Sequence, residues 1–248
     1  MKDNVILVTG ALAGIGRATA LAAASQGYRI VVSGRNSQTG AVLEVELRAL
    51  GAEAQFIQAD VRKESEVRIM IDGAVARFGR IDVAVNNAGT EGVAAPIVDQ
   101  TPEAYAATFE TNVLGVLLCM KHELRVMQSQ GSGSIVNISS TMGSRGAANA
   151  SLYVASTHAV EGLTKSGALE AAPSGVRVNA VAPGPVETRM LDRFTGSPDR
   201  KAGLLASIPL RRAGKPEELA DAILFLASDK ASFVTGQIIS VNGGRTAS

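Results

Sequence analysis

A glycine-rich turn near the start of the chain could bind a phosphate group. The apolar segment Val5–Val8 runs into Thr9-Gly10-Ala11-Leu12-Ala13-Gly14-Ile15-Gly16, after which helical periodicity begins. Glycine lets the backbone turn sharply and lets a pyrophosphate approach the N-terminus of a helix, where free N–H groups and the dipole favour an anion. A tight turn that binds nothing and an adenosylmethionine methyltransferase are alternatives, since the spacing Gly-x-x-x-Gly-x-Gly is not the commonest dinucleotide pattern.

The second apolar segment ends without the acidic residue that an NAD-binding enzyme usually carries there to bond the adenosine ribose. The segment reads Val32-Ser33-Gly34-Arg35-Asn36, and no Asp or Glu occurs between residues 4 and 43. A carboxylate would repel a 2′-phosphate, whereas an arginine can hold one through a charge-assisted contact. We therefore expect NADP(H) to be favoured over NAD(H), with Arg35 as the candidate residue. For Arg17, a phosphate contact and a solvent-exposed surface position are equally compatible with the sequence.

Short β-branched segments alternate with longer segments of helical periodicity along most of the chain. The expected strands are Val5–Val8, Ile30–Val32, Ala54–Ile57, Ile81–Val85, Ser134–Ile138, Val176–Ala180 and Gln237–Val241. The expected helices are Arg17–Gln26, Ala41–Leu50, Glu64–Phe78, Pro102–Gln128 and Leu152–Ala172, with a further helix beginning at Pro216. This alternation predicts one α/β domain, a doubly wound parallel sheet covered by helices on both faces. From 186 to 209 the rhythm breaks, which predicts a mobile lid or binding loop.

Composition excludes several classes of function. Lys plus Arg number 24 against 23 Asp plus Glu, and aromatic residues make up only 4%. The chain therefore offers neither the basic surface nor the stacking platform of a nucleic-acid binder. Its apolar stretches are too short to span a membrane, and the N-terminus lacks a signal-peptide pattern, so we expect a cytoplasmic protein. The single cysteine, Cys119, excludes an intrachain disulfide and a cysteine-rich metal site, and no metal is expected.

Motifs along the whole chain together resemble the short-chain dehydrogenase/reductase family. They are the glycine-rich turn, Asp60-Val61, Asn86-Asn87-Ala88-Gly89, Asn112, Ser140, Tyr153 and Pro183-Gly184. Their joint order is specific, including the 13 positions between Ser140 and Tyr153 (153 − 140 = 13). The methyltransferase alternative is therefore set aside. The resemblance implies a seven-stranded, Rossmann-type parallel sheet with three helices on each face.

The resemblance also implies which residues bind the cofactor. They are, for the phosphate turn, Thr9, Gly10, Gly14, Ile15 and Gly16; for adenine, Asp60 and Val61; for the adenine ribose, Asn87, Ala88 and Gly89; and for the nicotinamide carboxamide, Pro183, Gly184, Val186 and Thr188. Residues 1–90 would then mainly bind the dinucleotide, and residues 91–248 would hold the catalytic residues, the lid and a C-terminal interface strand.

The same resemblance assigns the catalytic residues. Hydride transfer to a carbonyl carbon needs a proton donor near the oxygen and a group that stabilises its developing charge. Tyr153 matches the family's general acid or base, and Ser140 matches the residue that orients the substrate oxygen. Asn112 matches a residue that opens a helix to hold a water in a proton relay. From the residues alone, it could instead make a hydrogen bond in the helix interior.

One position departs from the family. A tyrosine has a pKa of roughly 10 and is a poor base at neutral pH unless a cation stabilises the phenolate. The family supplies a lysine four residues after the tyrosine, on the same helix face, whereas this chain has Thr157 there. Lys165 is about 12 Å further along the helix, and His158 points to another side. We therefore expect the chain to bind NADP(H) but to turn over slowly.

Three interpretations of Thr157 compete: an engineered substitution, a natural pseudoenzyme, and an active variant that uses another cation. The first is favoured because every other motif is intact. The rival function is a catalytically inactive dinucleotide-binding protein or regulatory subunit, for which Thr157 is the sole support.

The substrate should contact Glu91–Ile97, Thr141–Ser151 and the segment after Thr188. These segments are mostly small and apolar, so a small uncharged ketone or secondary alcohol is expected, although Arg145 and Glu91 are exceptions. The expected helices Pro102–Gln128 and Leu152–Ala172 carry apolar residues broadly, which suggests an interface as well as a core. Since the family commonly pairs these helices and its last strand between subunits, we expect a homotetramer.

Overall fold

A seven-stranded parallel sheet forms the centre of the computed structural model, which describes residues 4–247. In the order β3-β2-β1-β4-β5-β6-β7, chain order reverses between β1 and β4. The strands are β1 Val5–Val8, β2 Arg29–Gly34, β3 Ala54–Gln58, β4 Val83–Asn86, β5 Gly133–Ile138, β6 Val176–Pro183 and β7 Ile238–Val241. All neighbouring strands pair in parallel. The predicted doubly wound fold is therefore confirmed.

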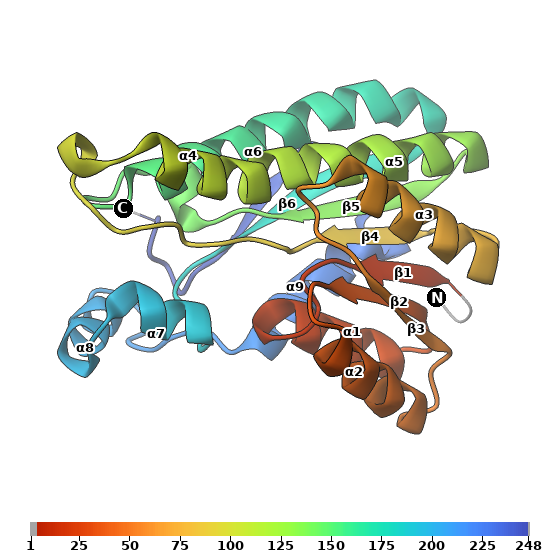
Figure 1. Ribbon diagram of the computed structural model, residues 1–248, viewed down its shortest axis with the longest axis horizontal. Coiled ribbons are helices and arrows are strands. Elements are labelled where there is room, and N and C mark those ends of the chain that lie inside the picture. Colours follow the sequence, from red (N-terminus) through yellow and green to blue (C-terminus); the bar gives the residue numbers. More distant parts are fainter. Residues whose placement is uncertain (1–3, 248) are drawn as a thin grey trace.

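Helices cover both faces of the sheet (Figure 1). One face carries α1 Gly14–Ser25, α2 Ser37–Ala49 and α9 Pro216–Ala227, and the other carries α3 Glu64–Phe78, α4 Pro102–Phe109, α5 Gly115–Gln130 and α6 Ser151–Ala171. Each layer packs an apolar core against the sheet. All four residues of β1 are completely buried between the layers, which explains why the strands are continuously apolar instead of alternating. None of the helices within residues 4–247 is long and apolar enough to cross a bilayer.

The helix expected over Pro102–Gln128 is interrupted. A π-helical turn, η2 Glu110–Leu114, separates α4 from α5. The helical pattern continues through all three segments without an intervening cap, so the apolar periodicity gives no sign of the extra residue. π-Turns of this kind occur frequently at functional sites. Here the turn contains Asn112, one of the candidate catalytic residues.

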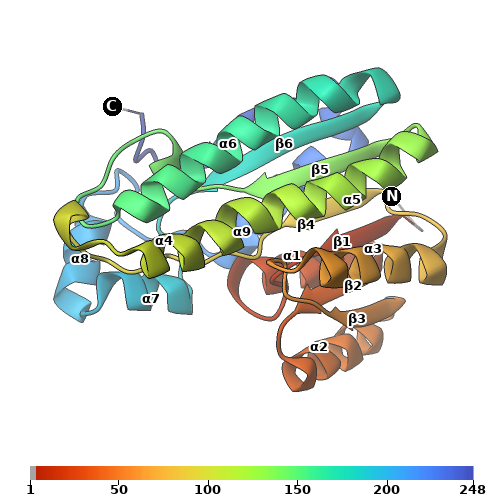
Figure 2. The same cartoon turned by 45° about the horizontal axis from the view of Figure 1, so that its top comes forward.

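The segment 186–209, expected as a mobile lid or binding loop, contains two short helices. They are α7 Arg189–Thr195 and α8 Pro198–Ala206, at the end of the molecule where the strands finish (Figures 1 and 2). The Thr188 hydroxyl accepts the Leu191 N–H at 3.4 Å, and the Ser197 hydroxyl accepts the Arg200 N–H at 3.3 Å. These N-caps define both helices, whereas segments of this length carry too few turns for a clear apolar period.

A buried polar network lies beneath the α5–α6 layer. The Asn86 amide donates to Oε2 of Glu123 and to Oδ1 of Asn137, both at 3.0 Å, and the Asn137 amide donates to the Thr164 hydroxyl at 2.9 Å. Glu123 is completely buried, and its Oε1 has no hydrogen-bond partner among the described residues. Burial raises the pKa of Glu123 to about 8, against a smaller opposing effect of the Asn86 hydrogen bond.

The folded protein should therefore lose stability as pH rises through the window set by Glu123. The unfolded carboxyl ionises near its ordinary pKa of 4.5, whereas the folded one keeps its proton to about 8. Unfolding releases a proton between these values, so the free energy of unfolding falls across that window. Glu123→Gln should remove this component. Denaturant unfolding of both proteins should show that the difference between their free energies of unfolding grows by about 4 kcal/mol in favour of the variant between the two pH values. A matched Glu170→Gln control, on an exposed part of α6, should show no such trend.

Candidate active site

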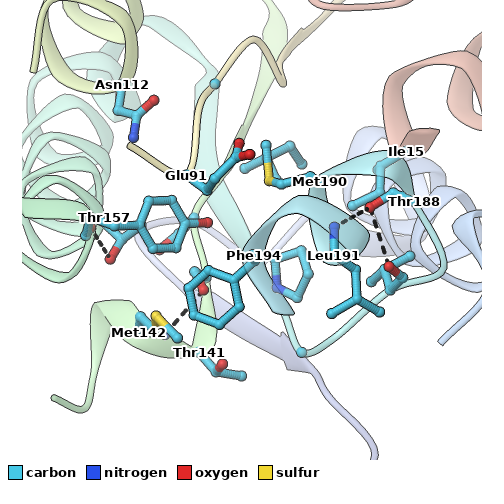
Figure 3. Close-up of a pocket in the computed structure, with 18 of the residues that line it drawn as sticks. Ile15, Glu91, Asn112, Thr141, Met142, Thr157, Thr188, Met190, Leu191 and Phe194 are labelled. Carbon is cyan, nitrogen blue, oxygen red and sulfur yellow. Dashed lines mark hydrogen bonds between the residues drawn. The ribbon is translucent and has the colours of Figure 1, made fainter. Parts of the chain in front are cut away.

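A pocket opens at the carboxyl ends of the parallel strands, where ligands of open α/β sheets bind. It encloses about 1020 Å³, part of it open to solvent. Eleven of the sequence-predicted site residues line it: Ile15, Asn87, Ala88, Gly89, Asn112, Ser140, Tyr153, Pro183, Gly184, Val186 and Thr188. Figure 3 shows Asn112 and Thr157 on one side of this pocket and Thr188, Met190 and Leu191 on the other. Seven predicted residues lie outside the lining: Thr9, Gly10, Gly14, Gly16, Arg35, Asp60 and Val61.

The glycine-rich turn is packed against the turn that follows β4. The Thr9 hydroxyl accepts the backbone N–H groups of Asn87 at 3.1 Å and Ala88 at 3.2 Å. The Asn87 side chain donates to the carbonyls of Thr9 and Gly10. A Cβ at Gly16 would come within 2.4 Å of the Asn87 amide nitrogen. Glycine is therefore required at this position by the close approach of the two turns.

The start of α1 has the features of an anion site. Gly14 adopts φ +54°, a left-handed conformation that favours glycine. Ala13, which precedes it, supplies no side-chain cap, and the first turn holds no acidic residue. The first N–H groups of the helix therefore lack a side-chain acceptor and, with the helix dipole, favour a phosphate. A pyrophosphate fits the residues present.

The charged side chains near the expected adenosine end differ in their partners. Nη2 of Arg17 donates to both carboxylate oxygens of Glu46, each at 2.6 Å, so the structure places Arg17 in an ion pair. Arg62 binds Asp60 through two nitrogens, Nε to Oδ1 and Nη2 to Oδ2, and this hydrogen bonding lowers the pKa of the Asp60 carboxyl. Arg35 is exposed and has no ion-pair partner among residues 4–247. It is therefore available to an external anion.

Ser140 and Tyr153 come together on the pocket wall. Ser140 follows β5 and is 9% exposed, and its hydroxyl accepts the Met142 N–H at 3.1 Å. Tyr153 lies in the first turn of α6 and lines the same pocket, near enough to Ser140 for that hydroxyl to influence its pKa. Burial is the main cause that raises the pKa of Tyr153, the Ser140 hydroxyl lowers it, and the charge of Glu91 raises it further. The phenol therefore keeps its proton at neutral pH.

Thr157 lies one helical turn beyond Tyr153 and also lines the pocket. It is 4% exposed. Its hydroxyl donates to the backbone carbonyls of Val154 at 2.9 Å and Tyr153 at 3.1 Å. Because this proton bonds within the helix, and because the side chain carries no charge, Thr157 cannot stabilise a Tyr153 phenolate as a cation would.

Asn112 joins three segments of the site. Its Oδ1 accepts the Thr90 N–H at 2.8 Å, and its Nδ2 donates to the Thr90 carbonyl at 2.8 Å and to the Ser156 hydroxyl at 3.0 Å. The side chain is 5% exposed, so these bonds satisfy a buried amide. Asn112 thus fixes the loop after β4 against α6, which positions Tyr153.

Some lining residues were not singled out in the sequence. Met190, Leu191, Phe194 and Leu204 come from the two short helices, and Arg245 comes from the tail after β7. The apolar residues of the helices gave no recognisable period over so few turns. Arg245 belongs to no motif, and only its position after the last strand could have indicated it. Glu91 was expected in the substrate region, and the structure pairs its carboxylate with Arg193 at 2.5 Å.

Comparisons with known protein sequences agree over nearly the whole chain. Residues 10–246 match the family model described as enoyl-(acyl carrier protein) reductase. The chain is 44% identical to cis-4-hydroxycyclohexanecarboxylate dehydrogenase of Sinomonas cyclohexanicum, over 99% of this chain and 97% of that protein. It is 42% identical to the 3-oxoacyl-(acyl-carrier-protein) reductase FabG of Staphylococcus epidermidis, over 96% and 97%.

Solved structures resemble the fold equally closely. Levodione reductase superposes with a TM-score of 0.97 at 34% identity, over 100% of this chain and 99% of that one. NAD⁺-bound xylitol dehydrogenase superposes with a TM-score of 0.94 at 35% identity, over 98% of this chain and 99% of that one. An actinorhodin polyketide ketoreductase with NADPH superposes with a TM-score of 0.94 at 36% identity, over 99% of both chains.

The contact between the two turns predicts a sensitive position for dinucleotide binding. In Gly16→Ala the added methyl group would meet Asn87 at 2.4 Å and the Gly10 carbonyl at 2.7 Å, so the turns must separate. The dissociation constant for NADPH, measured by calorimetry, should rise about ten-fold or more, a loss of about 1.4 kcal/mol. Gly203→Ala, where a methyl group meets nothing within 4 Å, is the matched control. Equal affinity in both variants would contradict a binding role for the turn.

Proposed function

Because this chain belongs to the short-chain dehydrogenase/reductase family, we propose that it interconverts a ketone and a secondary alcohol by hydride transfer. It is an oxidoreductase that acts on CH–OH groups. The observation that carries the proposal is the meeting of the Ser140 and Tyr153 hydroxyls in one pocket. In this proposal Pro183, Gly184, Val186 and Thr188 would hold the nicotinamide, and the turn from Thr9 to Gly16 would hold the phosphates.

A bound nicotinamide would donate the hydride during reduction and accept it during oxidation. During reduction, the Tyr153 phenol gives its proton to the substrate oxygen as negative charge develops there. The Ser140 hydroxyl donates a hydrogen bond to the same oxygen and orients it. During oxidation, Tyr153 must first lose its proton in order to accept one from the alcohol. Asn112 holds Ser156 and the loop after β4 and is a positioning residue.

We propose that Thr157 impairs this chemistry. General acid–base catalysis is most effective when the pKa of the catalytic group lies near the working pH, whereas burial raises that of Tyr153 above the ordinary phenol value of 10.0. A neutral threonine whose hydroxyl bonds within its helix does not lower it. An engineered substitution remains our interpretation of this position. A pseudoenzyme or regulatory subunit, favoured by Thr157 alone, is the second candidate.

For the cofactor we propose NADP(H) in preference to NAD(H). The support is Arg35, an exposed cation directly after β2 that has no ion-pair partner within the described chain. β2 itself ends without the carboxylate that would repel a 2′-phosphate. The related structures differ in this respect, since the xylitol dehydrogenase is bound to NAD⁺ and the polyketide ketoreductase is with NADPH.

For the substrate we propose a small ketone or secondary alcohol with an apolar body. Met142, Met190, Leu191 and Phe194 supply an apolar wall in the pocket that holds the two hydroxyls. Related proteins are named for a hydroxycyclohexanecarboxylate, a 3-oxoacyl carrier protein, levodione and xylitol. The apolar wall fits a ring or chain better than a polyol.

We propose that the protein assembles as a homotetramer. Exposed apolar side chains on the α4–α6 layer, including Tyr105, Leu117 and Leu169, support the pairing of these helices in a homotetramer. A cytoplasmic location stays a prediction from the sequence. The assignment of dinucleotide binding mainly to residues 1–90 and of catalysis to residues 91–248 also stays a prediction. Residues from both ranges line the pocket.

Restoring a cation beside Tyr153 should restore turnover. Thr157→Lys should raise kcat by about 100- to 10,000-fold, the range of general acid–base contributions. The gain should appear in both directions, because oxidation needs the phenolate and reduction needs a phenol that gives up its proton readily. In the unaltered chain the oxidation rate should still rise with pH beyond 10.0, because the Tyr153 pKa is raised. In the variant the rate should level off at a lower pH. Nicotinamide absorbance over a panel of ketones and alcohols measures both.

Ser65→Lys, at an exposed position of α3, controls for an added positive charge and should leave turnover unchanged. Turnover of the unaltered chain within about ten-fold of the Thr157→Lys form would show that this account of the tyrosine is wrong. NADPH binding without turnover in either form would favour the non-catalytic alternative.

Removing the Arg35 charge should change cofactor choice. Charged hydrogen bonds contribute about 1.5–3 kcal/mol, so Arg35→Ala should weaken NADPH binding by roughly 10- to 100-fold and NADH binding by much less. Calorimetric titration with both dinucleotides measures the ratio. Arg68→Ala, on exposed α3, is the control. A parallel loss for both dinucleotides in Arg35→Ala would argue against a 2′-phosphate contact.

A further inference from the structure

We propose that Arg245 anchors an anionic group of the substrate, so that the natural substrate carries a carboxylate besides its ketone or secondary alcohol. This inference rests on the proposed function, because it names the substrate class of the same pocket. It replaces the sequence-based expectation of an uncharged substrate. That expectation considered the segments 91–97 and 141–151, whereas Arg245 comes from the tail after β7.

The charges that line the pocket are not balanced. Within the described chain, Glu91 and Arg245 are its two charged lining residues. The Glu91 carboxylate already binds Arg193, with contacts of 2.5 Å to Nε and 3.1 Å to Nη2. The guanidinium of Arg245 has no hydrogen bond and no ion pair within residues 4–247. The pocket therefore presents one positive charge that the protein leaves uncompensated.

The backbone of Arg245 is fixed without using its side chain. Its N–H donates to Oδ1 of Asn242 at 3.0 Å, and its carbonyl accepts Nη1 of Arg145 at 2.8 Å. The tail after β7 is thus tied to the loop that precedes α6. The guanidinium stays free to bind a ligand, and the loop that carries it is held in place beforehand. Such preorganisation reduces the free-energy cost of binding.

The surroundings of Arg245 favour a bound anion. The side chain is half-buried, and burial together with the charge of Arg145 lowers the pKa of Arg245. A partly desolvated cation beside a second cation is costly unless an anion pairs with it. A planar carboxylate suits a guanidinium because it can accept two parallel hydrogen bonds.

Apolar side chains line the same pocket as this cation and the two hydroxyls. Met142, Phe194 and Leu204 share the pocket lining with Arg245, and Ser140 and Tyr153 supply the two hydroxyls. A matching ligand has an oxygen that reaches the hydroxyls, an apolar body that contacts the wall, and an anion that reaches the arginine. A keto acid or hydroxy acid with an apolar ring or chain has these three parts.

Two probes of nearly the same size, one charged and one neutral, test the anchor. They are 4-oxocyclohexanecarboxylate and its uncharged amide, 4-oxocyclohexanecarboxamide, each titrated by calorimetry into the NADPH-saturated protein. The acid should bind roughly 10- to 100-fold more tightly than the amide, as expected for a charge-assisted hydrogen bond. In Arg245→Met this ratio should fall toward one, and Arg245→Lys should keep part of it. Arg68→Met, at a distant exposed position, should keep the full ratio.

The proposal is overturned if the acid binds no more tightly than the amide, if the acid does not bind at all, or if the ratio persists in Arg245→Met. Thermal unfolding of the variants verifies that each is folded, and Arg245→Lys supplies a charged substitute should the methionine variant fail to fold. Turnover in the Thr157→Lys background separates the two proposals. If both probes are reduced at equal kcat/KM, the Arg245 anchor alone is refuted. If neither probe is reduced, the proposed hydride transfer is refuted.

Discussion

The hydrogen bonds between the turn after β1 and the turn after β4 hold together the centre of the site. Thr9 accepts two backbone N–H groups from Asn87 and Ala88, and Asn87 in return donates to the carbonyls of Thr9 and Gly10. These turns meet because β1 and β4 are neighbours at the point where strand order reverses. A ligand at this switch point can therefore contact loops from both halves of the sheet.

A second set of contacts extends this framework to the reacting groups. Asn112 ties the loop after β4 to Ser156 on α6, and Ser139 after β5 donates to Glu161 on the same helix at 2.9 Å. α6 is thus attached to the segments that follow β4 and β5. Ser156 makes the first attachment just before Thr157, and Glu161 makes the second one turn after it. The helix orientation that brings Tyr153 to Ser140 does not depend on the residue at 157, so a chain with threonine there can retain the geometry while it lacks the cation.

The sequence was sufficient for features that depend on local pattern, and less so for those that depend on tertiary contacts. The buried strands and the glycine-rich turn follow from apolar runs and backbone requirements, and the structure bears out the doubly wound fold. The π-turn at Glu110–Leu114 was missed because one extra residue leaves the apolar pattern of α4 and α5 continuous. The helices α7 and α8 are defined by single capping hydroxyls. Arg245 reaches the pocket only because β7 ends beside β6, which no local pattern reveals.

The environment of Tyr153 bears on both directions of the proposed reaction. Burial and the charge of Glu91 both favour the protonated phenol, which is the form that reduction consumes. The pairing of Glu91 with Arg193 moderates that charge without placing a cation against the phenol. A phenol of raised pKa is abundant as an acid but gives up its proton reluctantly, so its driving force for transfer is small. Oxidation in the proposed mechanism requires the phenolate, which is rare at neutral pH for the same reason. Because the overall equilibrium is unaffected, a raised Tyr153 pKa slows both directions of the proposed reaction at neutral pH.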